Sequence, residues 1–166
     1  DGGAYLAKAF VGEVIPFSAV VFREGHDALG VELILTSPTA KVSVHRMQPG
    51  SLGSGSWHTV AQLTEQSEYK FQIRAFGDDY ETWHHNATVK LAIGADEELM
   101  MLEGVNMFAG AAAEADRSAS EAKKLVELAE KLSDKTKSAK ARLAEAESST
   151  IAKYLAENPI RSLVTL

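Results

Sequence analysis

The chain has 166 residues, 45% of them hydrophobic, and a formal net charge of −6 at pH 7. This length is enough to bury a hydrophobic core and allows one domain or two small ones. Residues 1–95 carry seven Lys and Arg against ten Asp and Glu, and residues 96–166 carry ten against thirteen. Because phosphate binding depends on clustered basic side chains, we expect neither a nucleic-acid partner nor an anionic membrane surface as a partner.

The sequence contains no cysteine, which excludes a disulfide framework and a thiolate metal site. This composition fits a reducing compartment, so we expect a cytoplasmic protein. No apolar run approaches the ~20 residues that a membrane-spanning helix needs. The chain starts at Asp1 rather than Met and stops after the apolar run 163–166, so we expect it to be a piece of a longer protein.

The composition changes near residue 95. Ten of the twelve aromatic residues and ten of the twelve glycines precede Asp96, whereas residues 96–166 hold 14 alanines. Aromatic residues are enriched in strands, and alanine is the best helix former. The sequence therefore predicts an α+β fold, with a β domain at residues 1–95 followed by a helical part.

Alternating apolar residues predict about seven β-strands in residues 1–95, because a period of two puts every second side chain on one face. The runs 17–22 and 31–36 flank a polar turn and predict a hairpin. The other expected strands lie near residues 5–10, 41–45, 57–63, 69–75 and 83–93. Turn signals spaced by roughly 8–12 residues are typical of antiparallel sandwiches, so we expect an immunoglobulin-like β-sandwich.

From Asp96 the apolar residues recur with a helical period. Ser118 and Glu121 form an S-x-x-E capping box at the start of the second expected helix. A third helix is expected at 134–147 and a fourth at 150–157, ended by Asn158-Pro159. We predict an antiparallel bundle of three to four helices at residues 96–157, and a segment at 158–166 that returns to the sandwich.

Two histidine motifs invite a chemical interpretation. His26-Asp27 beside Glu24 resembles an acid/base group, but the motif lies in an expected hairpin turn, where these residue types serve backbone geometry. His84-His85 resembles a metal-ligand pair, but neighbours on a strand face opposite sides and cannot chelate one ion. We therefore expect no catalytic residue, no metal site and no cofactor.

The loop at residues 48–56 has the glycine and serine content of a phosphate-binding loop but lacks its Gly-Lys-Ser/Thr signature. We therefore expect a flexible connection there. The two tryptophans, Trp57 and Trp83, lie on alternating faces of expected strands. Core packing is the interpretation we favour for both, and stacking on a sugar ring is the alternative.

Four segments of the sequence carry a family resemblance. They are AKAFVGEVIP at 7–16, VFREGHDA at 21–28, GDDYETWHH at 77–85 and NPIRSLVT at 158–165. Together they resemble the N-terminal region of bacterial maltosyltransferases of the α-amylase clan, which extend α-1,4-glucan using maltose 1-phosphate.

This resemblance implies an immunoglobulin-like domain with an inserted helical bundle that takes part in a dimer contact. In such glycosyltransferases the catalytic barrel lies downstream, so no catalytic residue is carried over to this chain. The implied role is that of a non-catalytic accessory and dimerisation region in glycan biosynthesis, with a second copy as the expected partner and α-glucan as a further candidate partner. The alternative is a carbohydrate-binding module of an α-amylase-type glycoside hydrolase, which would use Trp57 or Trp83.

Overall fold

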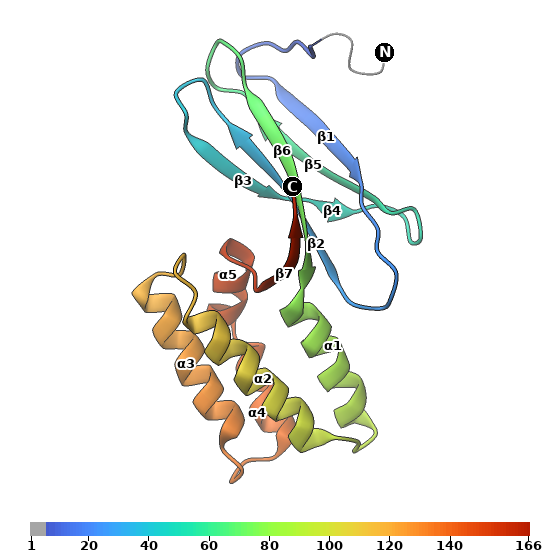
Figure 1. The fold of residues 1–166 in the computed structure, drawn as a ribbon, viewed down its shortest axis with the longest axis vertical. Coiled ribbons are helices and arrows are strands. Elements are labelled where there is room, and N and C mark those ends of the chain that lie inside the picture. The colour runs from blue at the N-terminus through green and yellow to red at the C-terminus, as the bar shows by residue number, and fades with distance from the viewer. Residues whose placement is uncertain (1–5) are drawn as a thin grey trace. The chain divides into compact units, whose positions relative to one another are not determined.

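The computed structural model describes residues 6–166 and shows an α+β fold with seven strands and five helices in that part of the chain (Figure 1). The chain divides into two compact units. The strand unit comprises the residues up to Gly77 together with Leu163–Leu166, and the helical unit comprises Asp78–Ser162. The predicted fold class is confirmed.

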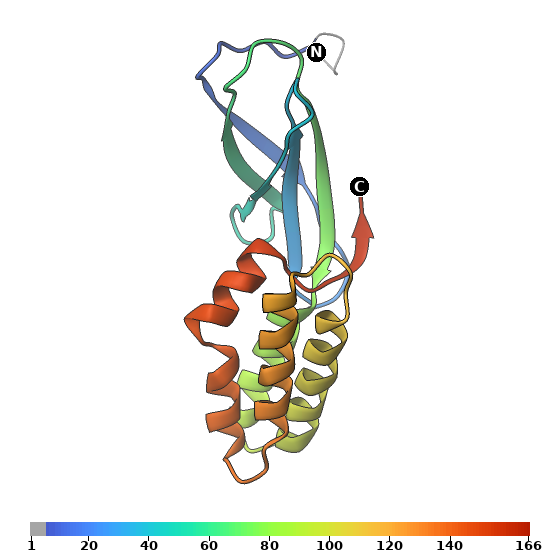
Figure 2. The same cartoon turned by 90° about the vertical axis from the view of Figure 1, so that its left-hand side faces the viewer.

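The seven strands form two antiparallel sheets (Figure 2). The first has the order β1 (Val14–Val20), β5 (Ser56–Gln62), β4 (Gln48–Pro49). The second has the order β3 (Val42–Arg46), β2 (Leu29–Thr36), β6 (Lys70–Asp78), β7 (Arg161–Thr165). This arrangement confirms the predicted β-sandwich.

The core of the strand unit follows the alternation in the sequence. Val31, Leu33 and Leu35 of β2 are buried, and they form one cluster with Met47 and Ala61. Partly buried side chains of β1, β5 and β6 complete it: Phe17, Ala19, Trp57 and Ile73. The period of two thus separates the side chains that fill the sandwich from those on its outer surfaces.

Glu32 is a buried charge in the middle of the second sheet. It lies opposite Arg74 of β6 and Arg46 of β3 in the strand register. The Arg74 Nε and Nη2 atoms donate hydrogen bonds of 2.8 and 2.6 Å to the Glu32 carboxylate, and Arg46 Nη1 lies 3.9 Å from it. Because a slip of one residue would turn this carboxylate to the other face, the pairing fixes the register of β2 with both neighbours.

Two predicted strands are wrong. Residues 6–10 form no strand, and Tyr5 lies outside the described residues. The predicted strand at residues 83–93 is a helix, α1 (Asp79–Ala92), so the helical unit begins at Asp78 rather than at the expected boundary near residue 95. The structure also places the short strand β4 inside the segment 48–56, which was expected to be a loop.

The start and the spacing of α1 explain why it is a helix. The Asp78 side chain caps the N-terminus by accepting a hydrogen bond from the backbone N–H of Glu81, at 3.2 Å. Trp83 and Ala87 are buried, four residues apart on one side of the helix. A separation of four fits a strand and a helix equally well, because it is a multiple of two and close to one helical turn. The cap was the signal that distinguished the two.

The other helices lie near their predicted positions. They are α2 (Glu97–Ala112), α3 (Ala119–Ser133), α4 (Ala139–Ala146) and α5 (Ser149–Glu157). The capping box at the start of α3 is confirmed, with Ser118 and Glu121 each accepting a hydrogen bond from the other's backbone N–H. The third predicted helix is shorter than expected, because the Asp134 carboxylate accepts from the backbone and hydroxyl of Thr136 and forms a turn instead.

Trp83 lies at the centre of the helical unit and is 5% exposed. Its indole N–H donates a hydrogen bond of 2.7 Å to the carbonyl of Met100, and the Phe108 ring meets it edge-on at 5.5 Å. Gly104 of α2 lies against the indole, where a Cβ atom would come within 2.5 Å of the ring. The absence of a side chain at Gly104 therefore allows α1 and α2 to pack closely.

Two glycines of α2 should respond in opposite ways to alanine. Gly104→Ala should lower the free energy of unfolding by about 1–3 kcal/mol, because the new Cβ overlaps the Trp83 ring. A Cβ at Gly110 meets nothing within 4 Å, so Gly110→Ala should raise it by roughly 0.5–1 kcal/mol through helix propensity. Urea denaturation measures both. Equal effects of the two substitutions would contradict the packing described here.

Candidate functional site

Helix α2 is apolar on two sides. Its inner side contributes Met100, Met101, Phe108 and Ala111 to the core of the helical unit. On its outer side Leu99 is 47% exposed and Leu102 is 54% exposed. A helix that is hydrophobic all round is normally buried all round, so the outer side of α2 has the composition of a contact surface.

A cleft of about 310 Å³ lies beside these two leucines. Leu99, Leu102 and Val105 of α2 form one wall, and Leu132 at the end of α3 and Arg142 of α4 lie opposite. We call Leu99, Leu102, Val105 and this cleft the outer α2 surface. All of it belongs to the helical unit.

The rim of the outer α2 surface is charged. Arg142 is 2% exposed and donates hydrogen bonds to the carboxylate of Glu98 and, at 3.0 Å, to the carbonyl of Leu132. The hydrogen bond from Arg142 lowers the pKa of Glu98. Lys135 Nζ lies 3.9 Å from the same carboxylate. The apolar cleft is therefore bordered by groups of both signs, which favours a partner surface that is itself mixed in charge.

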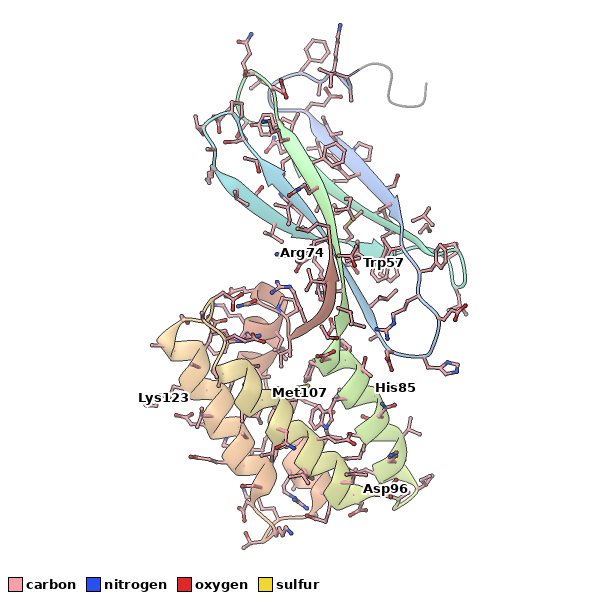
Figure 3. The ribbon with its side chains drawn as sticks, in the orientation of Figure 1. Trp57, Arg74, His85, Asp96, Met107 and Lys123 are labelled. Atoms are coloured by element: carbon pink, nitrogen blue, oxygen red, sulfur yellow. The ribbon has the colours of Figure 1, made fainter. Side chains whose placement is uncertain are left out.

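Trp83 offers no face to a sugar, because its ring is buried among Met100, Phe108 and Gly104. Trp57 lies in the strand unit (Figure 3) and is half-buried. Its indole N–H donates to the carbonyl of Val21 at 3.2 Å. Sugar stacking at Trp57 remains a prediction.

The histidine motifs have other partners. His84 and His85 lie on α1, so the argument from opposite faces of a strand was wrong (Figure 3). His84 Nε2 lies 2.9 Å from the Glu147 carboxylate, and its ring stacks on Tyr80 at 5.6 Å. In the turn before β2, Arg23 donates to Asp27 at 2.9 Å, and His26 is exposed. The described part of the chain contains no group of three or more His, Cys, Asp or Glu side chains that could hold a metal ion.

Sequence reasoning assigned the surface of the helices incompletely. Leu99, Leu102 and Phe108 belong to one apolar run in the sequence, although only Phe108 is buried. The sequence alone also allows Leu125 or Leu128 as an interface residue, but they are 0% and 3% exposed and belong to the core of their own unit. Helix α2 contains more apolar residues than one buried side of a helix needs. This surplus is the signal in the sequence for a second, exposed apolar side.

Within residues 6–166, no helix is both long enough and apolar enough to cross a membrane.

The family model described as alpha-1,4-glucan:maltose-1-phosphate maltosyltransferase, domain N/S, matches residues 1–166. The chain belongs to this family. The resemblance carried by the four sequence segments is thereby confirmed.

Three maltosyltransferases illustrate the similarity within the family. Alpha-1,4-glucan:maltose-1-phosphate maltosyltransferase 1 of Streptomyces coelicolor is 33% identical over 164 residues, which are 98% of this chain and 24% of that protein. The Corynebacterium pseudotuberculosis enzyme is 34% identical over 167 residues, which are 99% and 24%. The Mycobacterium tuberculosis enzyme is 30% identical over 118 residues, which are 57% and 17%. The chain thus spans about a quarter of the length of the first two maltosyltransferases.

Tyr80 gives the helical unit of this maltosyltransferase domain a pH dependence. Burial, helped by the nearby carboxylates of Glu81, Glu147 and Asp78, raises the pKa of Tyr80 to about 12. Its hydroxyl donates to the carbonyl of Ala146 at 3.2 Å. An unfolded tyrosine has a pKa of about 10. The stability that Tyr80 contributes is therefore complete below about pH 10 and is lost as the pH rises towards the folded pKa of about 12.

We expect Tyr80→Phe to flatten the decline of the melting temperature between about pH 10 and about pH 12. In an ultraviolet titration of the tyrosines, the same substitution should remove the ionisation step at the highest pH. Tyr154→Phe, which changes another tyrosine of the helical unit, is the control and should leave that step in place. An unchanged high-pH step in the Tyr80→Phe chain would show that Tyr80 is not the group that resists ionisation.

Proposed function

We propose that this chain is the non-catalytic accessory and dimerisation region of a maltosyltransferase that transfers maltosyl units from maltose 1-phosphate to α-1,4-glucan. The reaction is taken from the names of the relatives, of which the chain spans 24%. In this proposal the catalytic chemistry belongs to the rest of the enzyme. We place that enzyme in the cytoplasm, with which the absence of cysteine is compatible.

The outer α2 surface is the observation that carries the proposed role. Leu99 and Leu102 are about half exposed beside an apolar cleft, although the same helix already supplies the core on its other side. Leaving such leucines in water forgoes the roughly 25 cal/mol per Å² that burial of apolar area provides. Contact with a second surface recovers this free energy.

The charges at the rim favour a second copy of the chain as that partner. A two-fold contact places the same surface on both sides, so each group meets a symmetry-related set of groups. Glu98 is acidic and Lys135 is basic, and both side chains are exposed, so two copies of this rim can bring opposite charges together. We therefore propose a homodimer in which the outer α2 surface of each subunit lies in the interface.

The carbohydrate-binding alternative requires Trp57 or Trp83 as the residue that stacks on a sugar ring. Trp83 cannot take this role, because an indole that is 5% exposed has no open face. Trp57 is half-buried and already engages Val21 through its N–H. The tryptophans therefore give this alternative little support.

The proposed dimer is tested by placing a charge on the outer α2 surface. Leu99→Glu combined with Leu102→Glu should weaken self-association at least tenfold in sedimentation equilibrium, because two buried carboxylates would lack partners in the interface. Val89→Glu is the matched control, since Val89 of α1 is 50% exposed and lies outside the cleft. Both variants should stay folded, because the replaced residues are about half exposed within a single chain.

The measurement applies to residues 1–166 and to the longer enzyme that contains them. We expect stronger association in the longer enzyme, where the remaining chain adds contact area. A dimer that survives the double substitution, or that weakens equally with Val89→Glu, would refute the assignment of the outer α2 surface. Leu125→Glu or Leu128→Glu would not test the interface, because a glutamate in the core would unfold the helical unit.

A further inference from the structure

The strand unit contains a cleft of about 540 Å³ that the proposed dimer does not use. The coil at residues 6–11 and the turn at residues 65–69 between β5 and β6 form its edges. Phe17, Leu35 and Phe71 form its apolar floor. Its volume lies within the roughly 300–1,000 Å³ of small-molecule sites, and its lining is apolar with a few polar groups, as such sites are.

Phe71 presents a fixed aromatic surface in this cleft. Phe71 is 59% exposed, yet the Phe17 ring packs against its ring edge-on with centroids 5.3 Å apart. In the strand register Phe71 lies opposite Leu35, which is 4% exposed and supports the floor. An exposed ring that is held in place needs little ordering when a flat apolar ligand surface stacks on it.

Tyr69 places a hydrogen-bond donor next to this ring. Its hydroxyl oxygen accepts from the backbone N–H groups of Thr64 and Glu65, at 3.1 and 2.9 Å. The phenol thereby uses its acceptor capacity, and among residues 6–166 its own proton has no acceptor. The proton is available to a hydroxyl oxygen of a ligand.

The turn at 65–69 supplies acceptors for ligand hydroxyl groups. Thr39 donates to one oxygen of the half-buried Glu65 carboxylate at 3.1 Å, and the other oxygen has no partner among the described residues. Gln66 and Glu68 also border the cleft, and Lys8 is the single basic residue in its lining. Two carboxylates against one ammonium disfavour a phosphate or another anion, whereas a neutral polyol can donate to both.

We propose that this cleft binds a neutral oligosaccharide, namely a short segment of α-1,4-linked glucose. The apolar face of a glucose ring stacks on Phe71, its hydroxyl groups donate to Glu65, and the Tyr69 proton is donated to a ring or hydroxyl oxygen. The choice of glucose rests on the proposed function, since α-1,4-glucan is named in the reaction of the relatives. This site replaces the tryptophans as the sugar-contacting part of the domain.

The test is titration of residues 1–166 with maltoheptaose, followed by two-dimensional NMR of the backbone amides. The wild-type chain should show saturable shifts at residues 65–71. Phe71→Ala should weaken binding by about tenfold through loss of the stacking surface, whereas Phe71→Tyr, which keeps the ring, should bind like the wild type. Phe22→Ala is the matched control, because Phe22 is 81% exposed in the same unit and lies outside the cleft.

Four results would overturn the proposal. They are no saturable shift with maltoheptaose, equal weakening by Phe71→Ala and Phe22→Ala, shifts at these amides with inorganic phosphate, and binding of anilinonaphthalene sulfonate without saccharide binding. The last result would identify an apolar docking surface. Thermal melting confirms that each variant is folded. Sedimentation of the same samples reports self-association separately, so failure of the sugar site is distinguishable from failure of the proposed dimer.

Discussion

The packing of Trp83 against Gly104 is the contact on which the helical unit depends. The indole occupies space that is free only because residue 104 has no Cβ. The indole N–H donates its hydrogen bond to the carbonyl of Met100 in α2. A buried indole N–H without an acceptor would cost about 1–3 kcal/mol, so the hydrogen bond and the apolar contact reinforce each other. Together they make α1 part of the helical core rather than the last strand of a sandwich.

The same contact determines which side of α2 faces water. Once Gly104 lies under the indole, Phe108 and Met100 point into the core, and Leu99 and Leu102 have to point outward. The helix is apolar on both sides, so the fold leaves an unpaired hydrophobic surface with an ion pair at its rim. This surface links the packing of the helical unit to the proposed assembly of a longer enzyme.

The strand unit obeys a different constraint, which is the register set around Glu32. With Arg46 and Arg74 opposite one carboxylate, β2 cannot slip against either neighbour, and its alternate residues fill the sandwich. That register also places Phe71 opposite Leu35 at the end of the sheet, where the turn at 65–69 borders a cleft. The aromatic ring is 59% exposed there, although the Phe17 ring of β1 packs against it.

The sequence by itself determined the α+β class, the strands with clear alternation, the capping box at Ser118 and the family, because these depend on local patterns or on short motifs. It did not determine the state of residues 83–93, since Trp83 and Ala87 are spaced by four, which suits both periods. Nor did it distinguish Leu99 from Phe108, because residues of similar hydrophobicity differ in burial only through their neighbours. The tertiary structure decided both points, because helix packing leaves room for one side of α2 against Trp83 and none for the other.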